Sequence, residues 1–78
     1  MRLQVATEPE GFDPLTVGTT LRRAMRVAEV SQDRVAQRVG INDGHLNRLL
    51  RGFRTLTPEM AERIRLAVEE LAPDDVQW

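Results

Sequence analysis

The fold of this chain is decided by residues 32–51, which read QDRVAQRVGINDGHLNRLLR. The segment contains two amphipathic stretches that follow Ser31 and Asn42, side chains whose oxygens accept hydrogen bonds from the free N–H groups at the start of a helix. Gly40 lies where the first stretch ends, and a residue without a Cβ adopts the left-handed conformation of a helix end without strain. The segment therefore predicts two short helices joined by a tight turn.

The apolar residues of this segment have the spacing that two such helices need to pack on each other. Ala36, a small residue, lies on the first helix, and the aliphatic Ile41 follows the glycine. Leu46 and Leu49 lie on the inner side of the second helix. A small residue at the crossing lets the helices approach, and the aliphatic side chains fill the space around the turn. We interpret residues 32–51 as a helix-turn-helix motif.

Longer amphipathic helices are predicted on either side of this motif. Before it, an apolar stripe predicts a helix that begins near Thr16 or Val17 and ends around Glu29. That stripe consists of Val17, Leu21, Ala24, Met25 and Ala28. After the motif, Thr57 followed by Pro58 is typical of a helix start, and Pro73 prevents continuation. The second stripe consists of Met60, Ile64, Ala67, Val68 and Leu71.

The chain of 78 residues is long enough for one domain. Residues 1–15 contain prolines and a glycine and show no sustained helical period, so we expect a flexible N-terminal arm. Residues 16–72 form the expected helix-turn-helix domain, and residues 73–78 a C-terminal tail. The predicted fold class is all-α, a small four- to five-helix bundle.

The segment from Val17 to about Leu71 resembles the Cro and phage-repressor (XRE-type) family, whose fold is lambda-repressor-like. Similar residues fall at the family's positions in Val17-Gly18, Leu21-Arg22, Val30-Ser31-Gln32, Val35-Ala36, Val39-Gly40-Ile41, Leu46 and Arg51-Gly52-Phe53-Arg54. The stretch from Leu49 through Thr57-Pro58-Glu59 to Leu71 is also similar to the headpiece of the LacI family. Both families share one DNA-reading unit, and the long helix before Ser31 favours the repressor type.

One departure from the family pattern concerns a pair of positions. The family commonly has an arginine on its first helix and a glutamate before the glycine-containing loop, which form an ion pair. Met25 and Leu50 occupy those positions here. A hydrophobic pair replaces a buried ion pair with no loss of stability, and sometimes with a gain of about 1–4 kcal/mol. We therefore expect Met25 and Leu50 to touch.

The resemblance implies that helix 43–51 enters the major groove with its N-terminal end first. The candidates for contacts to base edges are Asn42, Asp43, Gly44, His45, Asn47 and Arg48. Arg48 suits guanine and Asn47 suits adenine. Asp43 either accepts from a cytosine amino group or caps the helix, and we favour capping. Gly44 offers backbone only, which favours readout of DNA shape.

The candidates for phosphate contacts are Gln32, Arg22, Arg23, Arg51 and Arg54. Gln32 matches a family position that contacts phosphate, and the arginines belong to a strongly basic window. Residues 19–54 contain eight arginines against three acidic residues, whereas the rest of the chain contains three arginines against nine acidic residues. Although the net charge of the chain is −1, residues 19–54 can therefore form a basic face that suits nucleic acid.

Several other classes of function are disfavoured. The chain has no cysteine and a single histidine, His45, so thiolate and multi-histidine metal sites are excluded. Acidic pairs occur only near the C-terminal end, where solvated charge is the usual state. We expect no enzyme, no catalytic residue, no metal and no cofactor. No apolar run reaches the roughly 20 residues that span a bilayer, and the first residues do not resemble a secretory signal, so we expect a cytoplasmic protein.

The sequence thus predicts a sequence-specific double-stranded DNA-binding transcriptional regulator, of the phage or mobile-element repressor type. We expect a homodimer on an inverted repeat, and no small-molecule ligand. The final predicted helix and the tail would form the dimer surface, where Trp78 is either an anchor or a disordered last residue. The alternative is a helix-turn-helix module that binds protein, such as an antitoxin or anti-repressor.

Overall fold

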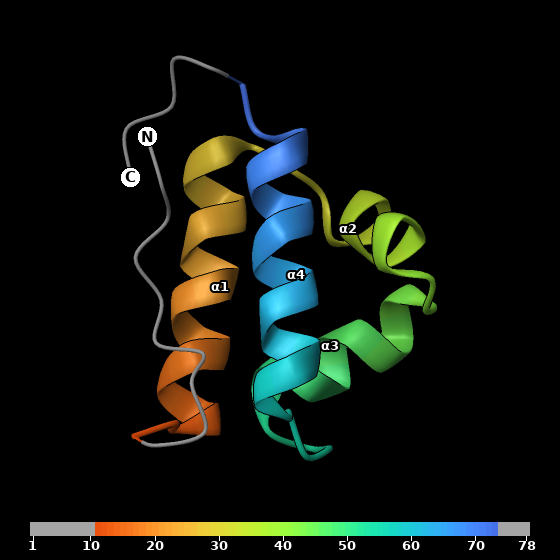
Figure 1. Cartoon of the computed structure of the whole chain (residues 1–78). Helices are drawn as coiled ribbons and strands as arrows, with labels where there is room; N and C mark the ends of the chain where they lie inside the picture. Colours follow the sequence, from red (N-terminus) through yellow and green to blue (C-terminus); the bar gives the residue numbers. More distant parts are fainter. Residues whose placement is uncertain (1–10, 74–78) are drawn as a thin grey trace.

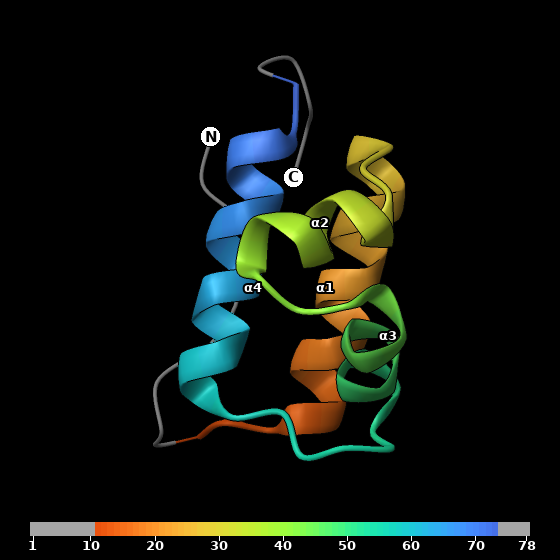
Figure 2. The ribbon, with the colours of Figure 1, turned by 90° about the vertical axis from the view of Figure 1, so that its right-hand side faces the viewer.

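Four helices make up the described part of the chain, and they lie in two layers (Figures 1 and 2). The computed structural model describes residues 11–73. The helices are α1 (Pro14–Ala28), α2 (Gln32–Val39), α3 (Asp43–Arg51) and α4 (Pro58–Leu71). The longer α1 and α4 lie side by side, and the short α2 and α3 cover one side of that pair. The predicted all-α bundle is confirmed, with four helices in residues 11–73.

The caps of the three later helices were predicted correctly. The side chains of Ser31, Asn42 and Thr57 accept hydrogen bonds from backbone N–H groups three residues further on. The donor–acceptor distances are 3.2 Å, 2.6 Å and 3.1 Å respectively. Each bond satisfies an N–H group that has no partner within its helix, so the cap fixes where the helix begins.

α1 begins at Pro14, earlier than the predicted start at Thr16 or Val17. Asp13 is the N-cap, and its carboxylate accepts from the N–H of Leu15 at 3.2 Å and from the hydroxyl of Thr16 at 2.7 Å. Pro14 occupies the first turn, where a helix needs no N–H donor. This start has the same form as Thr57-Pro58 in α4, but here it was read as part of the N-terminal arm.

Three helices end on a residue in the left-handed conformation. Gly40 and Gly52 have φ of 96° and 87°, values that glycine adopts without a steric penalty. At the end of α1 the same conformation falls on Glu29, with φ of 56°. A side chain makes this conformation costly, by about 1–2 kcal/mol. The predicted end of α1 around Glu29 agrees with the structure, in which Ala28 is the last helical residue and Glu29 is the C-cap.

The core lies between the two layers and draws on all four helices. The largest fully buried side chains are those of Leu21, Val35, Leu46, Leu50, Leu56, Ile64 and Val68. All five residues of the predicted stripe on α1 are buried. On α4 the prediction was less accurate, because Met60 and Leu71 are only half-buried while Ala61 and Arg65 are buried. The inner face of α4 is therefore rotated slightly from the predicted one.

α4 also holds α2 through two arginines. Arg63 donates from Nη2 to the carbonyl oxygen of Val39 at 2.6 Å, which provides a partner at the C-terminal end of α2. Arg38 on α2 forms an ion pair with Glu70 on α4. The bond from Arg63, together with the buried side chains, positions α2 and hence the helix that follows it, whereas the exposed ion pair of Arg38 adds little.

Some predictions fall on residues that the structure does not describe. Residues 1–10 of the predicted arm and residues 74–78 of the predicted tail, Trp78 included, lie outside the described residues. Within residues 11–73, none of the helices combines the length and the apolar character needed to cross a membrane.

Candidate nucleic-acid interface

α3 is held against α1 by an unusually close approach of two backbones. A Cβ atom at Gly18 would lie 2.5 Å from the carbonyl oxygen of Leu50, so only glycine allows this approach. Leu46, Leu49 and Leu50 are buried against the rest of the core. Because three inward side chains and a backbone contact fix α3, the direction of its outer face is fixed as well.

The outer face of α3 carries most of the predicted base-reading residues. Asp43 and Arg48 are exposed, and Gly44, His45 and Asn47 are half-buried. Residues three and four apart on a helix are neighbours, so 44, 47, 48 and 51 form one continuous surface. The structure therefore brings predicted base-reading residues together with Arg51, a predicted phosphate-contacting residue.

The side chain of Asn47 is oriented by Arg51. Arg51 donates from Nε to Oδ1 of Asn47 at 3.1 Å, one turn back along α3. This bond identifies which end of the amide carries the oxygen, and it directs the NH2 group away from Arg51. The remaining lone pair of Oδ1 and the NH2 group stay able to form the acceptor–donor pair that reads adenine.

Arg48 extends back along α3 toward Gly44. Its Nη1 would lie 3.6 Å from a Cβ atom built at Gly44, and Oδ1 of Asn42 would lie 3.5 Å from the same atom. The Arg48 guanidinium thus lies along the N-terminal half of the helix, within van der Waals distance of position 44. A planar guanidinium in this exposed position can donate a fork of hydrogen bonds to a ligand.

The cap of α3 corrects the favoured interpretation of Asp43. Asn42 is the N-cap, and its Oδ1 accepts from the backbone N–H of His45 at 2.6 Å. Asp43 is the first residue of the helix proper, where a carboxylate is favoured by the helix dipole. Asn42 consequently uses its side-chain oxygen in the fold and has its NH2 group left for a ligand.

Four of the five predicted phosphate-contacting residues lie on α2, at the end of α3, in the loop after it and on α1. Gln32 is the half-buried first residue of α2, while Arg51 and Arg54 are exposed at the end of α3 and in the loop after it. Arg22 is half-buried on α1, one turn after Gly18, and therefore on the flank that faces α3.

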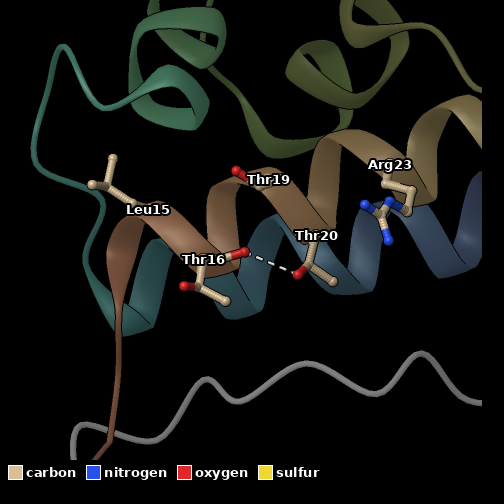
Figure 3. A pocket seen from close by; sticks show the side chains of 5 residues that line it. All are labelled: Leu15, Thr16, Thr19, Thr20 and Arg23. Carbon is tan, nitrogen blue, oxygen red and sulfur yellow. Dashed lines mark hydrogen bonds between the residues drawn. The ribbon is translucent and has the colours of Figure 1, made fainter.

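Arg23 occupies a different part of α1 from Arg22. It lines a shallow groove with Leu15, Thr16, Thr19 and Thr20 (Figure 3). Since successive residues on a helix are separated by about 100°, Arg23 is turned away from the flank that contains Arg22. Of these two arginines, Arg22 therefore lies on the side of α1 that faces α3, and Arg23 does not.

Not every arginine of the basic window is available to a ligand. Arg38 is paired with Glu70 on α4, and this pairing between distant parts of the chain gave no signal in the sequence. Arg65, outside the window, is 7 % exposed and bonds to Glu62 and Glu69. The bonds to Glu62 raise the pKa of Arg65 further, so its charge is retained within the fold. The spacing of these three residues was the signal that could have revealed this cluster.

A family model described as a helix-turn-helix domain matches residues 16–69. The chain belongs to the helix-turn-helix domain family. The match is of the XRE-like type and covers α2 and α3 entirely. Neither the curated proteins nor the solved structures contain a match to this chain. Membership implies DNA as a partner and a role in transcriptional regulation, and such domains are typical of regulators that are not enzymes.

The described residues offer no cluster of ligands suited to a metal ion. Within residues 11–73 no group of three or more histidine or acidic side chains lies close enough to hold one.

Proposed function

We propose that this chain is a sequence-specific double-stranded DNA-binding transcriptional regulator, of the repressor type found in phages and mobile elements, and that α3 enters the major groove. The observation that carries the proposal is the outer face of α3, where Arg51 orients the amide of Asn47 and Arg48 lies beside Gly44. A fixed amide and a fork of N–H donors on one helix face are the groups that read base edges.

Each base-reading residue has a role set by its chemistry. Arg48 donates to O6 and N7 of guanine, and Asn47 pairs with N6 and N7 of adenine. Asp43 accepts from a cytosine amino group, and the NH2 of Asn42 and the ring of His45 complete the N-terminal end of the surface. Gly44 contributes no side chain, so DNA shape supplies part of the specificity.

The phosphate contacts come from groups around α3. Gln32 and Arg22 contact the backbone on one side of the groove, and Arg51 and Arg54 contact it on the other. Arg23 adds a more distant charge. These contacts fix the position of α3 on the duplex and supply affinity that falls with salt, without reading sequence.

A homodimer on an inverted repeat fits this arrangement. One short recognition helix contacts few base pairs, and a second copy related by two-fold symmetry doubles the recognised sequence. Dimerisation also raises affinity, because two bound units dissociate less readily than one. Sedimentation of the protein with and without its selected site would give the stoichiometry.

The first test is a fluorescence-anisotropy titration against a pool of random duplexes at two salt concentrations, with sequencing of the bound fraction. We expect strong salt dependence and enrichment of a two-fold-symmetric site. Absence of binding at low salt would contradict the proposal and would favour the alternative function, a helix-turn-helix module that binds protein.

Variants then separate base reading from phosphate binding on the selected site. Arg48→Ala is expected to cost about 1–3 kcal/mol and to relax specificity at one base pair. Arg54→Ala is expected to weaken binding to all sequences alike and to reduce the salt slope by about one. Arg38→Ala is the matched control, since it removes an equal charge from a side chain that faces Glu70. Equal losses on every sequence for Arg48→Ala would disprove base reading by this residue.

A further inference from the structure

Phe53 is the most exposed large apolar side chain in residues 11–73, with 74 % of its surface accessible. It lies in the loop between α3 and α4, directly after Gly52 and between Arg51 and Arg54. Leu15, whose side chain reaches Gly52, is also exposed, and contiguous exposed apolar surface of this kind suggests contact with a partner.

Phe53 differs from the residues at the equivalent positions after α1 and α2, because its side chain is not packed into the core. α1, α2 and α3 all end with a left-handed residue, after which one residue donates its N–H back to a carbonyl five residues earlier. These residues are Val30, Ile41 and Phe53, which donate to Met25, Ala36 and Arg48 at 2.9 Å, 3.0 Å and 2.9 Å. In this motif the donor residue usually packs its apolar side chain on the acceptor residue.

At two of the three ends the burial of the residues fits that rule. Val30 is 6 % exposed and Ile41 is half-buried, and their partner residues Met25 and Ala36 are buried. At the end of α3 the partner position holds Arg48, an exposed residue of the reading face, so Phe53 has no apolar partner there. The backbone motif is complete without a buried ring, and the phenylalanine is therefore not needed to end the helix.

The charge around Phe53 indicates what kind of partner suits it. From Gly44 to Pro58 the chain contains no acidic residue and carries Arg48, Arg51 and Arg54. A second copy of this loop would be repelled by the same charges, whereas a polyanion would be attracted. Leu15 extends the apolar surface, because its Cδ2 would lie 2.7 Å from a Cβ atom at Gly52.

We propose that Phe53 contacts duplex DNA, with its ring against the deoxyribose groups at the edge of the minor groove next to the major groove that α3 occupies. This inference rests on the proposed function and extends it. Sugar C–H groups are the apolar part of the DNA backbone, and the flanking phosphates are bound by Arg51 and Arg54. Phe53 thus supplies an uncharged contact that does not depend on displaced counterions.

The test compares Phe53→Ala with the wild-type protein on the selected duplex. The affinity is expected to fall on the order of tenfold, while the slope of affinity against salt stays unchanged, since no charge is lost. Hydroxyl-radical footprinting is expected to show lost protection of sugars at the outer edge of the site alone. Thermal melting is expected to be unchanged, because the ring is largely exposed.

Val27→Ala is the matched control, an exposed apolar residue on α1 that is expected to leave binding unchanged. Unchanged affinity of Phe53→Ala on DNA that the wild type binds would overturn this inference and leave the proposed function standing. A loss of affinity explained by a lower oligomeric state in sedimentation would also overturn it, in favour of a dimer contact. A wild-type protein that binds no duplex would overturn both.

Discussion

The backbone of Gly18 in α1 lies directly against the carbonyl oxygen of Leu50 near the end of α3. A Cβ atom at Gly18 would be 2.5 Å from that oxygen and 3.2 Å from its carbon. Both neighbouring atoms belong to the backbone, so no side-chain rotation can relieve the overlap. This contact sets the separation of α1 and α3, and thereby the position of the helix that we propose enters DNA.

Gly18→Ala is expected to destabilise the protein by about 1–3 kcal/mol, because the added methyl group must push α3 away from α1. Urea denaturation followed by circular dichroism measures the change. Gly44→Ala is the control, since its Cβ atom would lie 3.5 Å and 3.6 Å from its nearest neighbours, in ordinary contact. That variant is expected to be neutral or slightly stabilising, and equal destabilisation by both would refute the close-approach argument.

The sequence predicted most of the fold because its signals are local. Caps, helix-ending glycines and apolar spacing are read within a few residues, and they gave the bounds of α2 and α3 correctly. The start of α1 was missed although Asp13 and Pro14 carry the same cap-and-proline signal as α4, because Pro14 was grouped with the earlier Pro9 and Gly11 as part of an arm. Glu29 gave no signal for its left-handed conformation, since that depends on the packing of Val30.

The sequence predicted which residues belong to the candidate site, but not the hydrogen bonds and ion pairs that they form. Spacing places Asn47 and Arg51 on one face of a helix, yet the bond between them is one of several that such spacing allows. The pairing of Arg38 with Glu70 joins residues 32 positions apart and requires the tertiary structure. Met25 and Leu50 are buried in one core cluster, as expected, and their direct contact stays a prediction.

The cap of α1 is expected to make stability sensitive to acid. The hydrogen bond from the Thr16 hydroxyl, with backbone N–H bonds, holds the pKa of Asp13 below its ordinary value of 3.8 despite an opposing desolvation effect. A lowered folded-state pKa means that the stabilising contribution is complete above pH 3.8 and is lost as the pH falls below it.

The measurement is thermal melting of wild type and Asp13→Asn over a pH series that crosses this range. Asparagine keeps the cap but does not titrate, so the difference in melting temperature between the two proteins is expected to shrink as the pH falls. If the difference in melting temperature stayed constant at every pH, the Asp13 carboxylate would have the same pKa in the folded and the unfolded protein, and the prediction would be wrong.

Arg65 is expected to stabilise the folded protein through both its charged guanidinium group and the buried methylene groups of its side chain. Its side chain is 9 % exposed, with Nε and Nη2 bonded to Glu62 at 2.7 Å and 2.6 Å and Nη1 bonded to Glu69. Arg65→Ala removes these bonds and the buried methylene groups, and about 1–3 kcal/mol is expected to be lost. Solvent around Glu62, which is 40 % exposed, weakens the electrostatic part.

Arg65→Met separates the two contributions, because it keeps an apolar stem and removes the charge. We expect its loss in urea denaturation to be smaller than that of Arg65→Ala. If both variants lost the same amount, the ion pairs alone would account for the effect of Arg65, and packing of the stem would have no part in it.

The bond between Arg51 and Asn47 leads to a prediction about DNA specificity. Arg51 donates to the oxygen of the Asn47 amide at 3.1 Å, so removal of Arg51 frees that amide to rotate. Arg51→Ala is therefore expected to lower discrimination at the base pair read by Asn47 as well as overall affinity. Arg54→Ala, which breaks no bond of this kind, is expected to lower affinity without changing discrimination.

A double-mutant cycle of Arg51→Ala and Asn47→Ala, measured by anisotropy on the selected site, tests the coupling. If Arg51 acts partly by holding Asn47, the two losses are not additive, and a coupling of about 0.5–2 kcal/mol is expected. Arg54→Ala combined with Asn47→Ala is expected to be additive within about 0.5 kcal/mol. Additivity in both cycles would mean that Arg51 and Asn47 act on DNA independently, and that the bond between them only stabilises the free helix.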